Sequence, residues 1–286
     1  MQNENCIAVV IPNYNGEEYL RKLKKPDGID VVVMDNASTD DSVRVCKKKG
    51  FIVVTNELHV DRTANWVRCL EFFRTSNYAW MKWLFVGDEL CQDVADIMND
   101  AINRHPDAAT IVFNYDIKEN NSLSKWKKTD IEKKYEISDV AKELVKGDNV
   151  FGSPIAVMIS KKVTDNIDFF DLHGFTWAAD VLLGYQYAKA GTVWKVNETI
   201  GTFDVSNRKH YVELSNSVFA TLEELELVRM ITNENKDLNW GSEYENTSVY
   251  HFFLRGFSKY PKRKLLGKFI RKLIFSKAEK TGNKVY

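Results

Sequence analysis

Two neighbouring carboxylates, Asp88 and Glu89, follow a hydrophobic run in the stretch WLFVGDEL at residues 83–90. The run is typical of a buried strand, which would end beside the two acids. Carboxylates at a strand end can bind Mg²⁺ or Mn²⁺, because these hard cations prefer oxygen ligands. The stretch therefore predicts a functional loop, and an acidic turn without a ligand is the alternative.

Polar residues also follow two earlier hydrophobic runs. Pro12, Asn13, Tyr14 and Asn15 come after CIAVVI, and Asp35 comes after IDVVVM. A buried carboxylate such as Asp35 can accept a hydrogen bond from a ligand N–H, and it disfavours ligands that leave it unpaired. The alternative role for Asp35 is to begin an Asx-turn in the sequence DNASTD.

The elements that must position these residues alternate regularly between strand and helix up to residue 115. Such alternation indicates βαβ units and a mostly parallel sheet, with ligands outside the carboxyl ends of its strands. The three polar clusters would then meet at one edge. The expected strands are 6–11, 29–34, 51–55, 79–86 and 109–114, and the expected helices are 17–25, 40–49, 63–73 and 93–103.

The rhythm changes after residue 115. Residues 116–130 are polar and rich in lysine, so we expect a loop there. Further on, the hydrophobic pattern predicts strands over 155–159 and 192–196, and helices over 138–146, 178–190 and 218–231.

Composition narrows the class of protein. The 286 residues carry 40 basic and 40 acidic side chains, and no apolar run has the length of a membrane span. The N-terminus lacks the pattern of a signal peptide, and the four cysteines lack metal-binding spacing. We therefore expect a cytoplasmic protein with free, mostly buried thiols, and no nucleic-acid partner.

The charge is concentrated near the C-terminus. Residues 256–286 contain ten basic residues and one acid, Glu279. Within KRKLLGKFIRK, apolar residues repeat at helical spacing opposite a basic face, which is typical of a helix lying on an anionic membrane surface. The alternative is a terminal helix that packs on the rest of the protein.

The series VVIPNYNGEEYL, VVVMDNASTD, DRTANWVRCLE and WLFVGDELCQD, followed by WAADVLLGYQYAKAG, resembles family 2 glycosyltransferases of bacterial type. The resemblance covers roughly residues 6–210. It implies an α/β GT-A fold, Rossmann-like, with a mostly parallel sheet flanked by helices. The implied domains are a catalytic domain over 1–215, with a nucleotide-binding half (1–115) and an acceptor half (116–215), and a helical C-terminal extension over 216–286 with its basic tail.

The resemblance also implies roles for individual residues on the donor side. Asp35 would bind the base of a nucleotide-sugar, in a pocket lined by residues 12–15. Arg62 and Asn65 would lie against the nucleotide, where a guanidinium suits a diphosphate; the alternative for Arg62 is a solvated helix end. Arg208 and His210 would lie near the diphosphate.

On the acceptor side, Asp180 matches the family's catalytic base, which takes a proton from the acceptor hydroxyl in an inverting transfer. Its alternative is an N-cap of the following helix, and the two roles are compatible. Trp177 would offer an apolar platform to a sugar, or else belong to the core. Trp66 is expected in the core.

The metal motif departs from the family, because the usual metal-binding Asp falls on Gly87. Either Asp88 and Glu89 bind Mg²⁺ or Mn²⁺ in a shifted register, which we favour, or the site depends weakly on metal and uses Arg62, Arg208 or His210 instead. We expect an inverting glycosyltransferase that moves a sugar, from a UDP-sugar by preference, to a glycan or lipid-linked acceptor in polysaccharide biosynthesis.

Two other functions remain open. One is a nucleotide- or glycan-binding relative whose motif has decayed. The other is a sugar nucleotidyltransferase, which needs a glycine-rich, basic phosphate loop after the first strand, and IPNYNGEEY lacks one.

Overall fold

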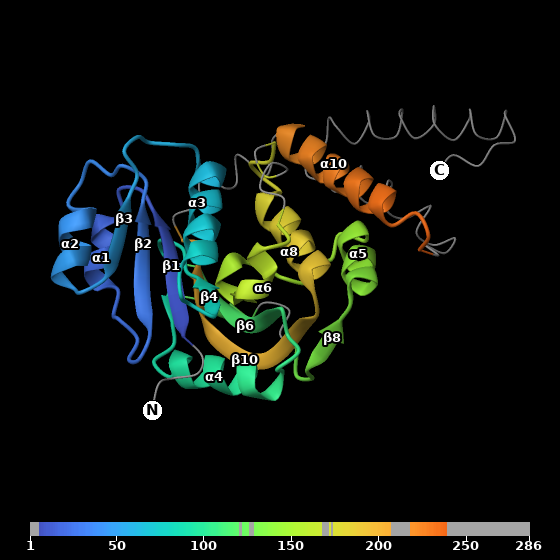
Figure 1. The fold of residues 1–286 in the computed structure, drawn as a ribbon, viewed down its shortest axis with the longest axis horizontal. Coiled ribbons are helices and arrows are strands. Elements are labelled where there is room, and N and C mark those ends of the chain that lie inside the picture. The colour runs from blue at the N-terminus through green and yellow to red at the C-terminus, as the bar shows by residue number, and fades with distance from the viewer. Residues whose placement is uncertain are drawn as a thin grey trace, which may run out of the picture. The chain divides into compact units, whose positions relative to one another are not determined.

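A computed structural model describes residues 6–119, 122–125, 129–167, 172, 174–206 and 218–238 (Figure 1). The chain divides into two compact units, residues 1–140 with 151–208 and residues 141–150 with 209–286. The first unit contains the sheet and all of the predicted donor-side strands. The boundaries predicted for the catalytic domain stay a prediction.

Among the described residues the sheet has ten strands, and eight of them lie in the order β3-β2-β1-β4-β9-β6-β10-β5. The first four of this order are parallel, whereas β9 runs antiparallel to both neighbours and β10 is parallel to β6. β7 pairs with β6, and β8 with β10. The strands are β1 (Ile7–Asn13), β2 (Asp30–Asp35), β3 (Ile52–Thr55), β4 (Trp80–Trp83), β5 (Glu89–Leu90), β6 (Thr110–Glu119), β7 (Ser122–Lys125), β8 (Lys133–Tyr135), β9 (Val157–Ser160) and β10 (Val193–Asp204).

Strand β1 passes through Pro12 and ends at Asn13, two residues later than predicted. The backbone amide of Leu84 donates to the Val10 carbonyl, and that of Asn36 donates to the Asn13 carbonyl. The backbone N–H and C=O groups of successive residues point toward the neighbouring strands on alternate sides. Those of Pro12 therefore point toward the β4 side, where β4 has already ended. The missing N–H of Pro12 therefore breaks no ladder.

Strand β4 ends at Trp83, three residues earlier than predicted. The chain then turns, with the Asp88 amide donating to the Phe85 carbonyl over 2.9 Å. Gly87 has φ +105°, a conformation that L-residues avoid. The turn sends Glu89 and Leu90 into β5, a short strand that pairs with β10 and was not predicted.

Residues 116–130 were predicted to form a loop, but part of this stretch forms strands. β6 continues to Glu119 and pairs antiparallel with β7, which places polar residues in a hairpin. β10 is also longer than predicted and shifts register against β6 on both sides of Thr199. Polar composition misled the prediction, because these strand ends are only partly buried and need no apolar alternation.

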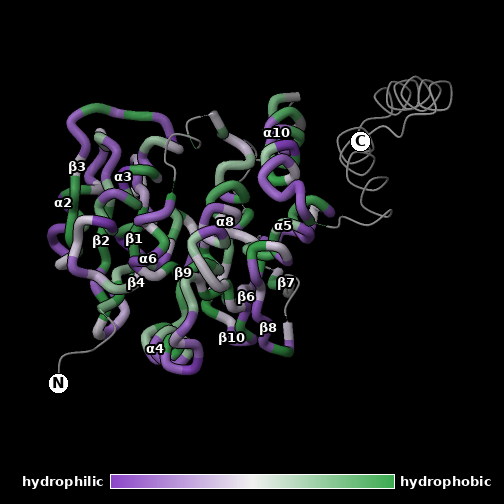
Figure 2. Tube along the Cα trace, turned by 45° about the vertical axis from the view of Figure 1, so that its right-hand side comes forward, coloured by the Kyte–Doolittle hydropathy of each residue, from purple (hydrophilic) through white to green (hydrophobic). Residues whose placement is uncertain are grey.

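Helices of this unit pack against the sheet and against other helices. α3 contacts β1, β2 and α6, α6 contacts β9 and α8, and α4 contacts β10 (Figure 1). The strands β1, β2 and β4 are almost wholly buried, whereas hydrophobic and hydrophilic residues mix along α4 (Figure 2). In the part of this unit that the structure describes, the helices are α1 (Glu17–Lys22), α2 (Ser42–Lys48), α3 (Arg62–Thr75), α4 (Val94–Arg104), the 3₁₀ turn η1 (Pro154–Ala156), α6 (Lys161–Thr164) and α8 (Ala179–Ala190), and α5 (Ile137–Val145) begins in it.

The second unit contains α10 (Val218–Glu234) in its described part, which confirms the helix predicted there. Among the described residues, no helix has both the length and the apolar character needed to cross a membrane. The basic tail at residues 256–286 lies outside the described residues. No disulfide joins the cysteines; Cys46 and Cys69 are buried as expected, whereas Cys6 is exposed.

Candidate active site

Asp35 ends β2 at the carboxyl edge of the sheet and is only 1% exposed. Its Oδ1 accepts hydrogen bonds from Asn13 Nδ2 (2.9 Å) and Ser38 Oγ (2.6 Å), and its Oδ2 accepts one from the Ser38 amide (3.0 Å). Asp35 thus caps the turn in DNASTD, although its backbone partner lies three residues on and not two, as an Asx-turn would require. These bonds hold the ends of β1 and β2 together, and contact between Asp35 and a base stays a prediction.

A second polar cluster lies behind this edge and joins three asparagines. The Asn36 side chain accepts from the Val60 amide (2.9 Å) and donates to the Val60 carbonyl (2.7 Å). Asn56 Nδ2 donates to the oxygens of both Asn36 and Asn65, and Asn65 Nδ2 donates to the Met34 carbonyl. Asn65 is buried, and its side chain is hydrogen-bonded within the protein, as expected of a structural residue. Its predicted contact with the nucleotide-sugar donor is untested.

Tyr14 and His59 form an exposed aromatic pair beside the polar edge. Tyr14 is 49% exposed, and its ring lies 4.2 Å from that of His59 between centroids. The backbone of Asn15 has φ +51°, and its amide donates to Ser38 Oγ. Of the predicted residues 12–15, Tyr14 and Asn15 are thus exposed, whereas Asn13 is buried.

Arg62, the first residue of α3, reaches the segment that leads into α8. Its guanidinium donates to the Thr176 carbonyl and lies 5.0 Å from the Trp66 ring, and Thr63 Oγ1 donates to the Phe175 carbonyl. Arg62 is therefore more than a solvated residue at a helix end, because its side chain links α3 to the segment before α8. It also lies close enough to Asp180 to favour its charged form.

Asp180 occupies the first turn of α8. The helix begins at Ala179 and its N-cap is Ala178, so the alternative of Asp180 as the N-cap is wrong. Asp180 Oδ1 accepts a hydrogen bond from the Val181 amide at 3.0 Å. Burial raises the pKa of Asp180 to about 6, although the Val181 N–H and the charge of Arg62 act in the opposite direction. A carboxyl group with this pKa is largely ionised at neutral pH and suits a general base.

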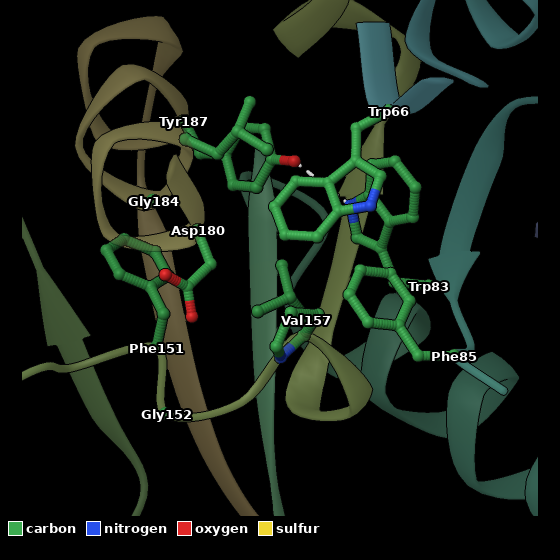
Figure 3. A pocket seen from close by; sticks show the side chains of 11 residues that line it. Trp66, Trp83, Phe85, Phe151, Gly152, Val157, Asp180, Gly184 and Tyr187 are labelled. Atoms are coloured by element: carbon green, nitrogen blue, oxygen red, sulfur yellow. Dashed lines mark hydrogen bonds between the residues drawn. The ribbon is translucent and has the colours of Figure 1, made fainter. Parts of the chain in front are cut away.

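Aromatic side chains surround Asp180 in a small pocket (Figure 3). Rings from three elements gather there, with Trp66 and Phe85 centroids 5.0 Å apart, and Trp83 Nε1 donates to Tyr187 Oη over 3.0 Å. The central cavity measures about 20 Å³, room for roughly one water-sized group. The lining residues are Trp66, Trp83, Phe85, Phe151, Gly152, Pro154, Val157, Asp180, Leu183, Gly184 and Tyr187.

Gly184 allows the pocket wall to lie close to α8. A Cβ at this position would come within 2.3 Å of Phe151 Cδ2, so any side chain would displace the Phe151 ring. Phe151 is buried, and it lies in the short loop before η1. The glycine therefore brings an aromatic ring to within contact of the helix that carries Asp180.

Asp88 and Glu89, the predicted metal ligands, do not converge on one point. Asp88 is 0% exposed and its charge acts on Lys82, whereas the Glu89 side chain is 68% exposed and lies 3.7 Å from Lys118 Nζ. Within the described part of the chain, no group of three or more His, Cys, Asp or Glu residues could hold a metal ion. Asp88 and Glu89 therefore do not form the joint Mg²⁺ or Mn²⁺ site that the sequence led us to expect.

Three other predicted residues need separate mention. Trp177 is half-buried in the segment before α8 and lies outside the set that lines the pocket. Arg208 and His210 lie outside the described residues, so their predicted place near a diphosphate is untested.

The structure also brings together residues that the sequence did not single out. These are His59, which pairs with Tyr14, and Phe85, Phe151 and Tyr187, which line the pocket. No local pattern could have found them, because the pocket joins side chains as far apart as residues 66 and 187. Only Gly152 and Gly184, as glycines beside large aromatic residues, hint at close packing.

Comparison with solved structures confirms the GT-A fold. A crystal structure of S. aureus TarS 1–349 in complex with UDP-GlcNAc matches with a TM-score of 0.62 and 15% identity, over 88% of this chain and 72% of that one. A longer S. aureus TarS structure matches with a TM-score of 0.53 and 14% identity, over 90% of this chain and 49% of that one.

A crystal structure of glucosyl-3-phosphoglycerate synthase from Mycobacterium tuberculosis, in complex with Mn²⁺, UDP and glucosyl-3-phosphoglycerate, has a TM-score of 0.50 and 15% identity, over 79% of this chain and 81% of that one. No protein-family model and no curated protein matches the chain. At such low identities the likeness establishes the fold, and the chemistry must be argued from the site.

Proposed function

We propose that this protein is an inverting glycosyltransferase that uses a nucleotide-sugar donor, with Asp180 as the general base. The observation that carries the proposal is a carboxyl group of pKa about 6 in an aromatic pocket on a GT-A fold. Its pKa lies close to neutral pH, where a base is both ionised and able to take a proton.

The transfer is a single displacement. Asp180 takes the proton of the acceptor hydroxyl while that oxygen forms a bond to the anomeric carbon of the donor. The bond from the anomeric carbon to the phosphate oxygen breaks, and the nucleoside diphosphate leaves with its electron pair. Aromatic rings around Asp180 exclude water, which would compete with the acceptor.

UDP is the nucleotide we favour. The TarS and glucosyl-3-phosphoglycerate synthase structures contain UDP-GlcNAc or UDP, and this chain shares their fold. In the proposed complex the uracil base of the nucleotide lies at the edge formed by Asp35 and residues 12–15. The exposed ring of Tyr14 would serve as its stacking surface. Arg62, Arg208 and His210 would offset the charge of the diphosphate.

The acceptor we propose is a glycan or lipid-linked glycan, with Trp177 as a platform for a sugar face. A lipid-linked acceptor would suit attachment of the basic tail, residues 256–286, to an anionic membrane surface. This part of the proposal depends on the sequence pattern of the tail.

The test is a panel of nucleotide-sugars assayed for nucleotide release and glycoside formation, with the wild-type protein and Asp180→Asn. We expect turnover with at least one UDP-sugar, and a loss of kcat on the order of 10²- to 10⁴-fold in the variant with unchanged UDP affinity. Asp100→Asn, at an exposed acid of α4, is the matched control and should keep full activity.

A binding relative without catalysis is the second candidate, and the poor fit of Asp88 and Glu89 to a metal site favours it. It predicts that UDP binds while no donor turns over, so the same panel separates the two functions. Equal activity of the wild type and Asp180→Asn would contradict the proposed base.

A further inference from the structure

Lys82 lies in β4 and is fully buried, although the ammonium group of a lysine normally reaches solvent. This ammonium group donates hydrogen bonds to three backbone carbonyls, those of Trp83 (2.9 Å), Ile155 and Val157 (3.4 Å). An ammonium group has three protons to donate, so three carbonyls use them all. Buried carbonyls need donors as well, and loss of Lys82 would take one from each of the three.

The three acceptors belong to the wall of the aromatic pocket. Pro154 and Val157 line the pocket, and Ile155 lies between them in the turn η1, fully buried. Trp83 and Val157 extend into the pocket from different elements (Figure 3). Lys82 is not among the lining residues, so it lies behind the wall and joins two of its parts.

Other contacts hold the first half of the same wall. Tyr115 Oη, from β6, accepts a hydrogen bond from the Ser153 amide over 3.1 Å. Phe151 packs so closely on α8 that a Cβ at Gly184 would meet its ring. The segment that closes the pocket is thus fixed to β6 and α8, and Lys82 adds a connection to β4.

We infer that Lys82 is a positioning residue for the proposed base, because it fastens the segment 154–157 to the end of β4 and so holds the pocket wall in place around Asp180. The inference rests on the proposed function for the role of Asp180. The hydrogen bonds and the packing of the wall do not depend on that function.

Loss of Lys82 could act on Asp180 in two opposite ways. If the wall loosens, water reaches the carboxyl group and its pKa falls from about 6 toward 3.8, because burial is the main cause of the shift. If the wall stays in place, only a positive charge is lost, which raises the pKa. Arg62 on α3 and Tyr187 on α8 also interact with the Asp180 carboxyl group, and the variant keeps both.

The test compares Lys82→Met with Lys161→Met. Lys161 Nζ also donates to two backbone carbonyls, those of Phe73 (2.8 Å) and Ser76 at the end of α3, and Lys161 does not line the pocket. Each variant loses an ammonium group that holds backbone carbonyls, so both should lower the Tm.

Only Lys82→Met should change the chemistry. We expect the acid limb of its kcat/KM profile to move down by about one pH unit as Asp180 gains water. Its kcat should fall about tenfold or more, because the acceptor is held less well against the base. The basic limb is not compared, since burial lowers the pKa of Lys82 itself to about 7.

Two measurements on the free protein need no turnover. Carbon-13 NMR titration of the Asp180 carboxyl group, assigned by its absence from Asp180→Asn, should show the same downward shift of the pKa in Lys82→Met. Backbone amides over residues 151–157 should exchange hydrogen faster in Lys82→Met than in the wild type, and at the wild-type rate in Lys161→Met.

An unchanged or raised pKa of Asp180 in Lys82→Met would overturn the inference, and so would an equal fall in Lys161→Met. If no donor turns over, the proposed function is wrong, while the NMR titration and hydrogen exchange still decide the role of Lys82. If Lys82→Met does not fold, Lys82→Gln takes its place, because an amide can still donate to two of the carbonyls. It should show a smaller shift in the same direction.

Discussion

Asp180 illustrates, at the residue scale, how a proposed catalytic base can cost stability. Its carboxyl group is surrounded by aromatic rings, and burial raises its pKa to about 6 from the ordinary 3.8. Folding therefore favours the neutral form, whereas the proposed base must be ionised. Function and stability thus make opposite demands on one side chain.

We predict from this conflict that Asp180→Asn stabilises the protein near pH 7.5. A carboxyl group with a raised folded-state pKa contributes stability below about pH 4, and this contribution is lost as the pH rises through about 6. Asn cannot ionise and avoids the loss. Because Asp180 is only half-buried, the gain should be about 1 kcal/mol, or roughly 2–4 °C in Tm.

The measurement is thermal unfolding of both proteins from pH 4 to pH 8. The difference in Tm should grow with pH and level off above about pH 7, whereas Asp100→Asn should show no such gain. A lower Tm for Asp180→Asn at pH 7.5 would mean that its surroundings favour the ionised form.

The element scale explains why the pocket exists. α8 carries Asp180 and Gly184 one turn apart, and Gly184 lets Phe151 lie against the helix. β4 supplies Trp83 and its following loop supplies Phe85, while α3 supplies Trp66. The pocket is therefore a junction of separate elements, and its shape depends on how closely they approach.

Gly184→Ala should destabilise the protein although alanine favours helices. The new Cβ would come within 2.3 Å of Phe151 Cδ2, so the buried ring must move. Overpacking of this kind costs about 1–3 kcal/mol, which outweighs a helix-propensity gain of about 1 kcal/mol in most of that range. We also expect reduced turnover, because Phe151 lines the pocket with Asp180.

Chemical denaturation of the variant checks this expectation. Gly174→Ala is the control, because no atom lies within 4 Å of its would-be Cβ, and it should change the unfolding free energy by less than about 0.5 kcal/mol. If Gly184→Ala proved as stable as the wild type, the close packing of Phe151 on α8 would not matter.

At the scale of the whole molecule, a formal net charge of zero conceals a strong separation of charge. Residues 256–286 have a balance of +9, so the remainder has −9. An acidic body repels anionic lipid, whereas the basic, amphipathic tail attracts it. The chain as a whole should thus bind membranes through one segment only.

We predict salt-sensitive binding to vesicles that contain anionic lipid. Each basic residue near such a surface contributes about 1 kcal/mol, and the attraction is screened by salt. Cosedimentation should show the full chain bound at low salt and released at high salt, with a chain ending at residue 255 unbound throughout. Equal binding to neutral vesicles would instead favour a tail that acts through its apolar face alone.

Much of the fold followed from the sequence alone. The buried runs before Asn13 and Asp35 and the helical pattern before Gly191 placed β1, β2 and α8 to within a few residues. Local hydrophobic periodicity suffices for this, because a buried strand and an amphipathic helix each require their own spacing. The order of the motifs then indicated the GT-A fold, and the proposal of Asp180 as the base came from its place in that order.

Other features depended on the tertiary structure. The long β10 arises from pairing with β6, which is distant in sequence, and the pairing of β6 with β7 joins polar segments that local composition does not mark as strands. The direction of Asp88 is of the same kind: the sequence offered an acid beside a strand end, and it could not tell solvent from core. Only the fold buries Lys82 and Asp88 and brings aromatic rings into one pocket with Asp180, because burial and charge act through space and not along the chain.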